Sequence, residues 1–234
     1  MKQVLRSLFL LALPASFLGA QVQPKSFSVT TRLGSITAER AASLDPAGLL
    51  GLDTEYALTK WFGIGTAIDV SRGNTTKKDF LGRYRYGSAT VGGGDSIYYQ
   101  YLGQPVNIVN LSAIGFLRFP AKRVSPFLMG GVGTYLMLLD AQVSNTAKRK
   151  TDLSYTGGGG IWFRLSNSTG IQLDARAVTY TKYDRAFLDP SKARLPNFSF
   201  PQDFPLPPAK KTTALNTTLT LGFRYIPGAA GGTN

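Results

Sequence analysis

The sequence predicts an all-β protein, namely an eight-stranded antiparallel up-and-down transmembrane β-barrel with short periplasmic turns and long extracellular loops. Three observations support this prediction. Eight strand-like segments follow an N-terminal leader, the gaps between them alternate between short and long, and apolar and polar residues alternate along most of them. Tight turns on one side and long loops on the other are typical of outer-membrane barrels.

The N-terminal leader has the pattern of a cleaved signal peptide. Lys2 and Arg6 flank the start of an apolar run, Leu8–Leu13, and small residues lead to Ala20. After the leader, no apolar stretch of about 18 residues occurs, so no transmembrane helix is predicted. The predicted organisation is a signal peptide at residues 1–20, an outer-membrane β-barrel domain at 21–226 and a disordered tail at 227–234.

The predicted strands mostly reach the length of about 9–11 residues that a tilted strand needs to cross a bilayer. They are Ser26–Gly34, Gly48–Leu58, Trp61–Val70, Asn107–Phe119, Pro126–Leu139, Asp152–Leu165, Gly170–Tyr180 and Thr212–Ile226.

The gaps between the strands set the predicted sidedness. The short gaps are Leu58–Lys60, Pro120–Ser125 and Ser166–Thr169, and the long gaps are Ser35–Ala47, Ser71–Val106, Asp140–Thr151 and Thr181–Lys211. We expect the short gaps and both termini on the periplasmic side and the long gaps outside the cell. The second long gap is rich in Gly and Tyr and the fourth in Pro, so both are expected to be irregular.

The two faces of each strand follow from the two-residue period of side chains. Ile171 and Leu173, for example, share one face, and Gln172 and Asp174 share the other. A secreted β-barrel carrier with an apolar core would show the same alternation. Small residues and nearly balanced charges on the polar face favour the membrane barrel.

Aromatic residues near strand ends also favour the membrane barrel, because they resemble the girdles found at membrane interfaces. They are Tyr56, Phe62, Phe119, Phe127, Phe163 and Tyr225. The segment Pro126–Leu139 is apolar on both faces, so its phase is not determined by the pattern.

Charged residues on the polar face are predicted to point into the lumen, which in a barrel of this size is just wide enough for side chains to fill. Buried charge is tolerated when it is paired with opposite charge. We therefore expect a salt-bridge network that plugs the barrel. Its predicted members, four acids and four bases, are Asp53, Glu55, Asp69, Asp174, Arg118, Arg164, Arg176 and Arg224.

The composition excludes several kinds of chemistry. The chain has no His and no Cys, which rules out a Ser-His-Asp triad and argues against a structural zinc site. Asp53 and Glu55 share a face at a spacing of about 6–7 Å, which could suit glycoside hydrolysis. Inward ion pairing explains them better, so we predict no catalytic residue, no metal and no cofactor.

The chain is strongly basic, with 26 Lys and Arg against 13 Asp and Glu. Export by the leader argues against nucleic acid as a partner and favours outer-membrane lipid, above all lipopolysaccharide, or another extracellular anionic ligand. Generic solvation of the loops explains the basic residues equally well. The candidate anion-binding residues of the long gaps are Arg72, Lys77, Lys78, Arg83, Arg85, Lys148, Arg149 and Lys150.

Three Gly-rich segments with aromatic ends resemble strands of the eight-stranded outer-membrane barrel family, the OmpA-like and OmpX-like barrels. They are Pro126–Tyr135, Tyr155–Phe163 and Leu219–Tyr225. The resemblance covers about Ser26 to Ile226 and implies a last strand that the outer-membrane assembly machinery recognises. This family usually ends on an aromatic residue, whereas here further residues follow Tyr225.

The resemblance and the lack of His together favour a non-enzymatic outer-membrane protein with a structural or surface-interaction role. Two alternatives stay open at the level of sequence. One is a narrow pore for ions or small solutes, and the other is the secreted carrier.

Overall fold

The computed structural model describes residues 24–76, 84–91, 94–100, 104–121, 123–139, 148–188 and 213–227. Within these residues lie ten strands and two short 3-10 helices. The strands are β1 (Phe27–Ala38), β2 (Ala47–Ala57), β3 (Phe62–Asn74), β4 (Tyr84–Val91), β5 (Gly94–Gln100), β6 (Pro105–Arg118), β7 (Val124–Leu139), β8 (Lys148–Arg164), β9 (Thr169–Thr181) and β10 (Thr213–Tyr225), and the helices are η1 (Arg40–Ala42) and η2 (Arg185–Leu188).

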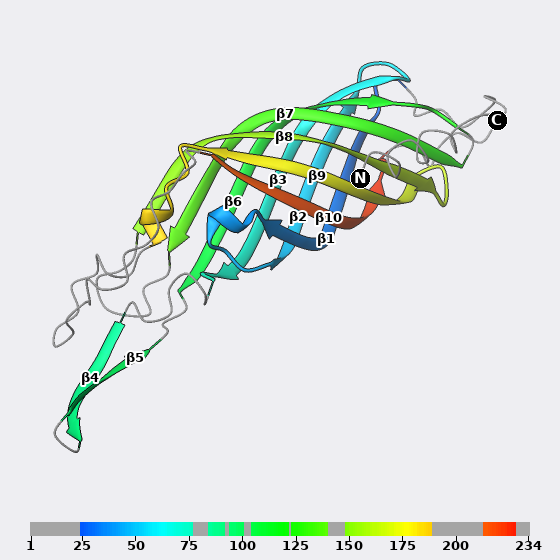
Figure 1. Ribbon diagram of the computed structural model, residues 1–234. Helices are drawn as coiled ribbons and strands as arrows, with labels where there is room; N and C mark the ends of the chain where they lie inside the picture. Colours follow the sequence, from blue (N-terminus) through cyan, green and yellow to red (C-terminus); the bar gives the residue numbers. More distant parts are fainter. Residues whose placement is uncertain are drawn as a thin grey trace, which may run out of the picture.

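Eight of these strands form a closed barrel in the order β1-β10-β9-β8-β7-β6-β3-β2 (Figure 1). Every neighbouring pair in the barrel is antiparallel, including the first and last strands. The predicted eight-stranded up-and-down barrel is therefore confirmed. Among the described residues, no helix is long and apolar enough to cross a membrane.

Several strands extend further than the sequence pattern predicts. The prediction ends the third barrel strand at Val70, but β3 continues to Asn74, and β8 begins at Lys148 rather than at Asp152. The ladder between β7 and β8 continues to the pair Leu139↔Lys148. Backbone pairing does not need an alternating apolar face, so hydropathy alone underestimates these ends.

The second long loop contains a hairpin, which corrects the expectation of an irregular segment. Strands β4 and β5 pair antiparallel from Tyr84↔Gln100 to Val91↔Gly94 and form a separate two-stranded sheet. The sequence places two residues, Gly92-Gly93, between these strands, and Gly-Gly is a favoured two-residue hairpin connection. The fourth long loop from residue 189 to 212, the leader and the tail from residue 228 lie outside the described residues.

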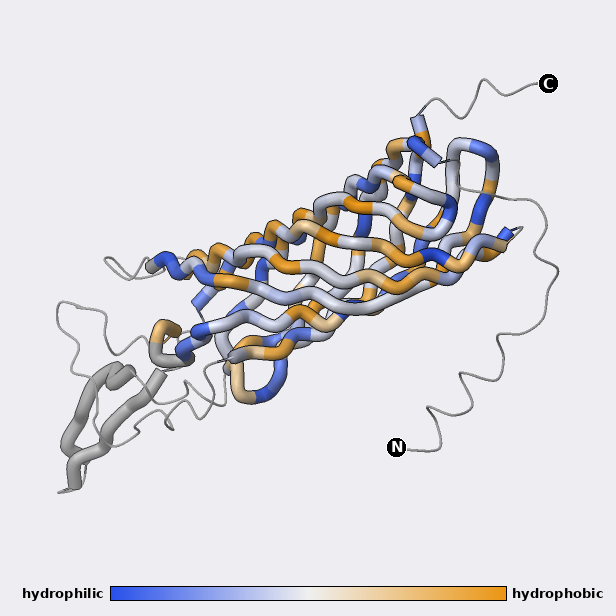
Figure 2. Tube along the Cα trace, turned by 90° about the horizontal axis from the view of Figure 1, so that it is seen from above, coloured by the Kyte–Doolittle hydropathy of each residue, from blue (hydrophilic) through white to orange (hydrophobic). Residues whose placement is uncertain are grey.

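The outer face of the barrel is apolar. Figure 2 shows hydrophobic and hydrophilic residues alternating along the strands, and the large apolar side chains of this alternation are exposed. Leu219, in the middle of β10, is 56% exposed, while its neighbours Thr218 and Thr220 are buried. This pattern inverts that of a soluble core and suits a wall that faces lipid.

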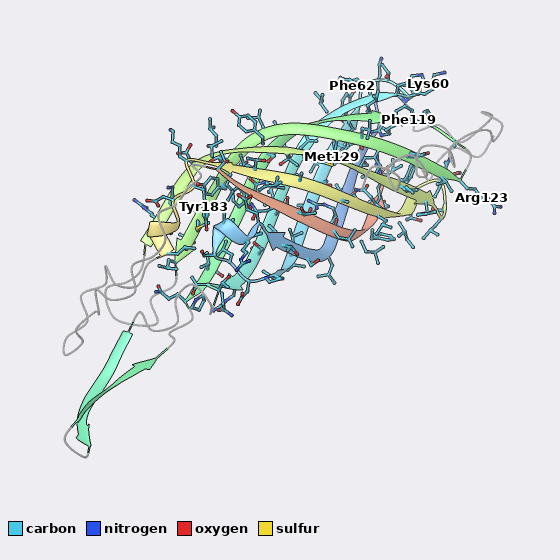
Figure 3. The ribbon with its side chains drawn as sticks, viewed as in Figure 1. Lys60, Phe62, Phe119, Arg123, Met129 and Tyr183 are labelled. Atoms are coloured by element: carbon cyan, nitrogen blue, oxygen red, sulfur yellow. The ribbon has the colours of Figure 1, made fainter. Side chains whose placement is uncertain are left out.

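The aromatic girdle is largely as predicted, with one exception. Tyr56, Phe62, Phe119, Phe163 and Tyr225 are exposed near the end of the barrel that carries the short turns, here called the short-turn end. Figure 3 shows Lys60, Phe62, Phe119 and Arg123 toward this end and Tyr183 toward the opposite, long-loop end.

Phe127 is the exception, because it points into the barrel. It is 5% exposed and packs against Phe116, with ring centroids 6.3 Å apart. The prediction was wrong because the strand around Phe127 is apolar on both faces, so its phase could not be read. Met129 and Ile114 share this interior cluster.

The long-loop end of the interior is filled by apolar side chains and covered by the two 3-10 segments. The rings of Tyr135 and Tyr180 pack against each other at a tilt of 31°, with centroids 4.4 Å apart. The Tyr183 hydroxyl donates a hydrogen bond of 2.5 Å to the carbonyl oxygen of Ala42 in η1. The interior is therefore layered, with an apolar layer at the long-loop end and charged groups closer to the short-turn end.

Candidate functional site in the lumen

Charged side chains from six barrel strands meet inside the barrel because each occupies an inward position of its strand. On β2 the inward positions include Asp53 and Glu55, and on β9 they include Asp174 and Arg176, as the alternating burial shows. The buried charges form two groups. The Asp53 cluster comprises Arg32, Asp53, Asp69, Asp174 and Arg176, and the Glu55 cluster comprises Glu55, Arg118 and Arg224 with Trp162.

In the Asp53 cluster, two arginines bridge three carboxylates. Arg32 Nη2 donates to Asp53 Oδ1 at 2.9 Å and to Asp69 Oδ1 at 2.5 Å. Arg176 donates from Nη2 to Asp53 Oδ2 at 2.5 Å and from Nε to Asp174 Oδ1 at 2.7 Å. None of these side chains is more than 8% exposed. The cluster therefore cross-links β1, β2, β3 and β9 through the centre of the barrel.

In the Glu55 cluster, two arginines share one carboxylate. Arg118 Nη2 pairs with Glu55 Oε1, and Arg224 Nη2 donates to Glu55 Oε2 at 2.7 Å. The Arg224 guanidinium carbon lies 4.8 Å from the centroid of the Trp162 ring, which is a cation–π geometry. All four residues lie near the short-turn ends of their strands.

The two clusters carry opposite excess charge. The Asp53 cluster has two bases and three acids, 2 − 3 = −1, and the Glu55 cluster has two bases and one acid, 2 − 1 = +1. Their sum is zero. Pairing keeps buried charge tolerable, and here the balance is complete only when both clusters are counted together.

Two inward-facing glycines leave room for these ion pairs. A Cβ on Gly51 would lie 2.7 Å from both the Arg32 guanidinium carbon and an Asp69 carboxylate oxygen. A Cβ on Gly63 would collide with the Glu55 carboxylate and lie 2.9 Å from Arg118 Nη2. The absence of a side chain at these two positions is thus part of the site.

Seven of the eight sequence-predicted lumen residues lie in the two clusters, and Arg164 does not. Arg164 is half-buried at the end of β8, where Nε donates to the Ser166 carbonyl at 3.0 Å and Nη2 to Asn167 Oδ1 at 2.9 Å. Its inward phase is as predicted, but it is the last residue of the strand. Acceptors of the adjacent turn are therefore closer to it than the lumenal carboxylates.

The fourth arginine of the two clusters is Arg32, which the sequence analysis did not include among the lumenal residues. It is 2% exposed and contacts two of the three acids of its cluster within 3 Å. The signal was present, because Ser28, Thr30 and Arg32 alternate with Val29 and Leu33 on β1.

The candidate anion-binding residues at the long-loop end are only partly described. Lys77, Lys78 and Arg83 lie outside the described residues. Arg72 is exposed near the end of β3, and Arg85 belongs to β4. Placing Lys148, Arg149 and Lys150 in a loop was wrong, since they are the first residues of β8.

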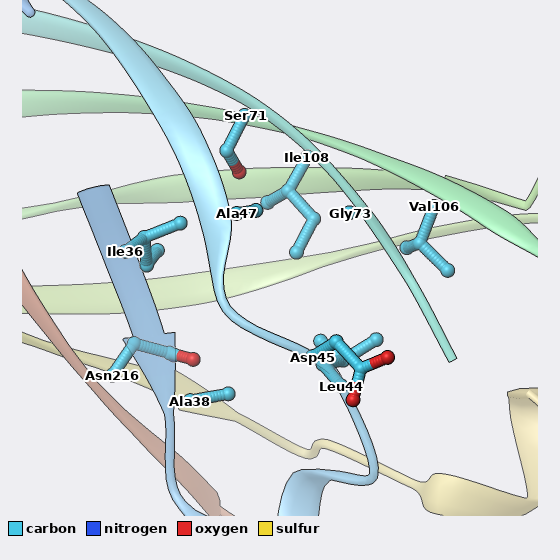
Figure 4. Close-up of a pocket in the computed structure, with 10 residues that line it drawn as sticks. All are labelled: Ile36, Ala38, Leu44, Asp45, Ala47, Ser71, Gly73, Val106, Ile108 and Asn216. Atoms are coloured by element: carbon cyan, nitrogen blue, oxygen red, sulfur yellow. The ribbon is translucent and has the colours of Figure 1, made fainter. Parts of the chain in front are cut away.

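A small pocket opens at the long-loop end between β1, β2, β3, β6 and β10 (Figure 4). Its lining is mainly apolar, including Ile36, Val106 and Ile108, with Ser71, Asp45 and Asn216 as polar members. It shares no residue with either charged cluster. The lumenal ion pairs, rather than this pocket, are the most distinctive chemical feature of the described chain.

The chain aligns with several solved structures at low sequence identity. Neisserial surface protein A aligns with a TM-score of 0.47 and 9% identity, covering 86% of this chain and 95% of that chain. OprG from Pseudomonas aeruginosa aligns with a TM-score of 0.46 and 10% identity, covering 89% and 99%. Ail of Yersinia pestis, crystallised with the heparin analogue sucrose octasulfate, aligns with a TM-score of 0.41 and 11% identity, covering 86% and 97%.

The family of the chain follows from its sequence. A search of curated proteins found no match. The family model described as the outer membrane protein beta-barrel domain, however, matches residues 7–226, nearly the whole chain. Together with the closed eight-stranded barrel, this match shows that the chain belongs to the outer membrane protein beta-barrel family.

Proposed function

We propose that the protein is a non-enzymatic barrel of the bacterial outer membrane with a plugged lumen and a structural or surface-interaction role. The observation that carries this proposal is the Asp53 cluster. Its five side chains join strands on different sides of the barrel and are almost entirely buried. Ions would have to break several of these pairs to pass.

The engagement of the lumenal carboxylates supports a non-enzymatic role. A glycosidase would need one free acid and one free base beside its substrate. Here Asp53 binds Arg32 and Arg176, and Glu55 binds Arg118 and Arg224. Both carboxylates are sealed from solvent and already neutralised.

We further propose export by cleavage of residues 1–20, with the short turns in the periplasm and the long loops outside the cell. In this orientation Arg149 lies at the extracellular end of the barrel. It is exposed and stands opposite the exposed Leu138 in the β7–β8 ladder. A cation beside an apolar residue suits a lipopolysaccharide, whose phosphates sit above acyl chains.

Planar-bilayer recording tests the plugged lumen. The purified, folded protein is expected to give no unitary conductance steps at moderate voltage. Resolved steps that change in size when Asp53 is replaced by Asn would instead establish the narrow-pore alternative.

Two further assays test location and partner. Outer-membrane recovery with a heat-dependent shift on an unboiled gel is expected, whereas recovery in the soluble periplasm would favour a secreted carrier. Replacing residues 148–150 by Ala should weaken binding to lipopolysaccharide micelles, and Arg123→Ala at the opposite end is the matched control. Equal binding by both variants would contradict the lipopolysaccharide proposal.

A further inference from the structure

The Glu55 cluster contains buried hydrogen-bond donors that its single carboxylate does not satisfy. Within the described part of the chain, Arg118 Nε and Nη1, Arg224 Nε and Trp162 Nε1 are buried and have no hydrogen-bond partner. The three side chains come from β6, β10 and β8, and each residue is at most 4% exposed. Buried hydrogen-bond donors nearly always have an acceptor in folded proteins. Leaving one without an acceptor costs folding free energy, and the cost is larger when the donor belongs to a charged group.

The excess charge of the cluster has the sign that an anion would neutralise. Two guanidinium groups face one carboxylate, leaving +1. Among the described residues, the other fully buried charged groups belong to the Asp53 cluster, where all three acids already bind arginine. Arg32 Nε and Nη1 in the Asp53 cluster also have no hydrogen-bond partner, but an anion there would meet an excess of carboxylate. Between Arg118 and Arg224 it would meet free donors and an excess of positive charge.

We propose that the Glu55 cluster is a binding site for a small monovalent inorganic anion of the halide class. The anion accepts charge-assisted hydrogen bonds from Arg118 and Arg224, and the Trp162 indole N–H is a further donor. The +1 excess selects a single negative charge. The surroundings are closely packed, since a methyl group on Gly63 would lie within 3 Å of Arg118 Nη2, and this favours a monatomic ion over a polyatomic one.

The tryptophan content of the chain offers a direct probe, since the only two tryptophans are Trp61 and Trp162. Trp61 is 40% exposed on the outer wall and Trp162 is 3% exposed inside. In the full chain carrying Trp61→Phe, folded in detergent, iodide both occupies the site and quenches Trp162. Iodide should quench in a saturable manner at constant ionic strength, and chloride should reverse the quenching, while the neutral quencher acrylamide has little effect.

Variants of the cluster should change the affinity in opposite directions. Arg118→Gln leaves the neutral Glu55–Arg224 pair and should weaken iodide binding about tenfold or more, as expected for a lost hydrogen bond to a charged group. Glu55→Gln removes the competing carboxylate and should tighten binding by a similar factor. Arg164→Gln changes an arginine at the same end that is hydrogen-bonded within its turn, and it should leave the affinity unchanged.

A heat-dependent gel shift identifies the variants that fold, and chloride displacement in the Trp61→Phe protein tests the site without any lumenal substitution. Quenching that rises linearly with iodide and is indifferent to chloride would overturn the proposal. So would the absence of quenching, or a Glu55→Gln protein that folds but binds iodide no more tightly.

Discussion

Replacing Asp53 by Asn tests whether the lumenal ion pairs hold the barrel together. Asparagine keeps the shape of the side chain and removes its charge. Arg32 and Arg176 both lose the negative charge of an ion-pair partner, at 2.9 Å and 2.5 Å respectively. The amide nitrogen of asparagine also faces donors where an acceptor is required.

The expected loss can be estimated from the contacts that survive. Breaking a buried ion pair by removing one partner costs about 3–5 kcal/mol. Arg32 still pairs with Asp69 and Arg176 with Asp174, so the lower end applies. We expect Asp53→Asn to lower the free energy of unfolding by about 3 kcal/mol.

Urea unfolding in lipid vesicles, followed by tryptophan emission and by mobility on an unboiled gel, measures this change. Asp45→Asn is the matched control, because Asp45 is exposed at the long-loop end and should change stability by less than about 0.5 kcal/mol. The double variant with Arg176→Met should lose less than the sum of the single losses, because the two residues are in contact. An Asp53→Asn protein as stable as the control would refute the stabilising role of the cluster.

Three other substitutions probe features of the wall and the interior. Gly51→Ala should destabilise the barrel by about 1–3 kcal/mol through overlap with Arg32, whereas Gly48→Ala, with nothing within 4 Å of its Cβ position, should be tolerated in the same urea assay. Leu219→Arg should cost about 2–4 kcal/mol in vesicles because it puts a charge into lipid near mid-strand, and an equal cost for Thr213→Arg at the end of β10 would contradict that view. Tyr183→Phe should cost about 1 kcal/mol and speed hydrogen exchange around Ala42, while unchanged exchange would show that the hydroxyl bond does not fasten η1.

The sequence predicts the wall of this barrel better than its interior. Positions such as Leu173 and Leu219 are exposed on the outer face as expected, because lipid demands apolar residues and the two-residue period reveals them. The interior has no such single demand. It holds Met129 and Phe127 as well as Asp53, so a strand that is apolar on both faces, such as β7, has no phase that can be read.

Which charged side chains form ion pairs depends on the register between strands and on how far each side chain extends. The alternation of apolar and polar residues shows neither of these. Arg164 has the inward phase but ends beside its own turn. Arg32 shares the inward phase of Ser28 and Thr30, and its long side chain is in contact with acids of both β2 and β3. The extensions of β3 and β8 were missed for a related reason, since backbone pairing continues where the hydropathy pattern stops.

The antiparallel seam between β1 and β10 has a consequence for the order of events during assembly. Asp53 and Arg176 are 123 residues apart in the chain, and Glu55 and Arg224 are 169 apart. In the ring, β2 is separated from β10 by β1 and from β9 by β1 and β10, so these residues come together when β1 pairs with β10. Until that moment these two ion pairs cannot form, whereas Arg32, on β1, can already reach Asp53 and Asp69 on β2 and β3. Closing the seam and forming these two ion pairs are therefore coupled, so a barrel whose seam is still open lacks both.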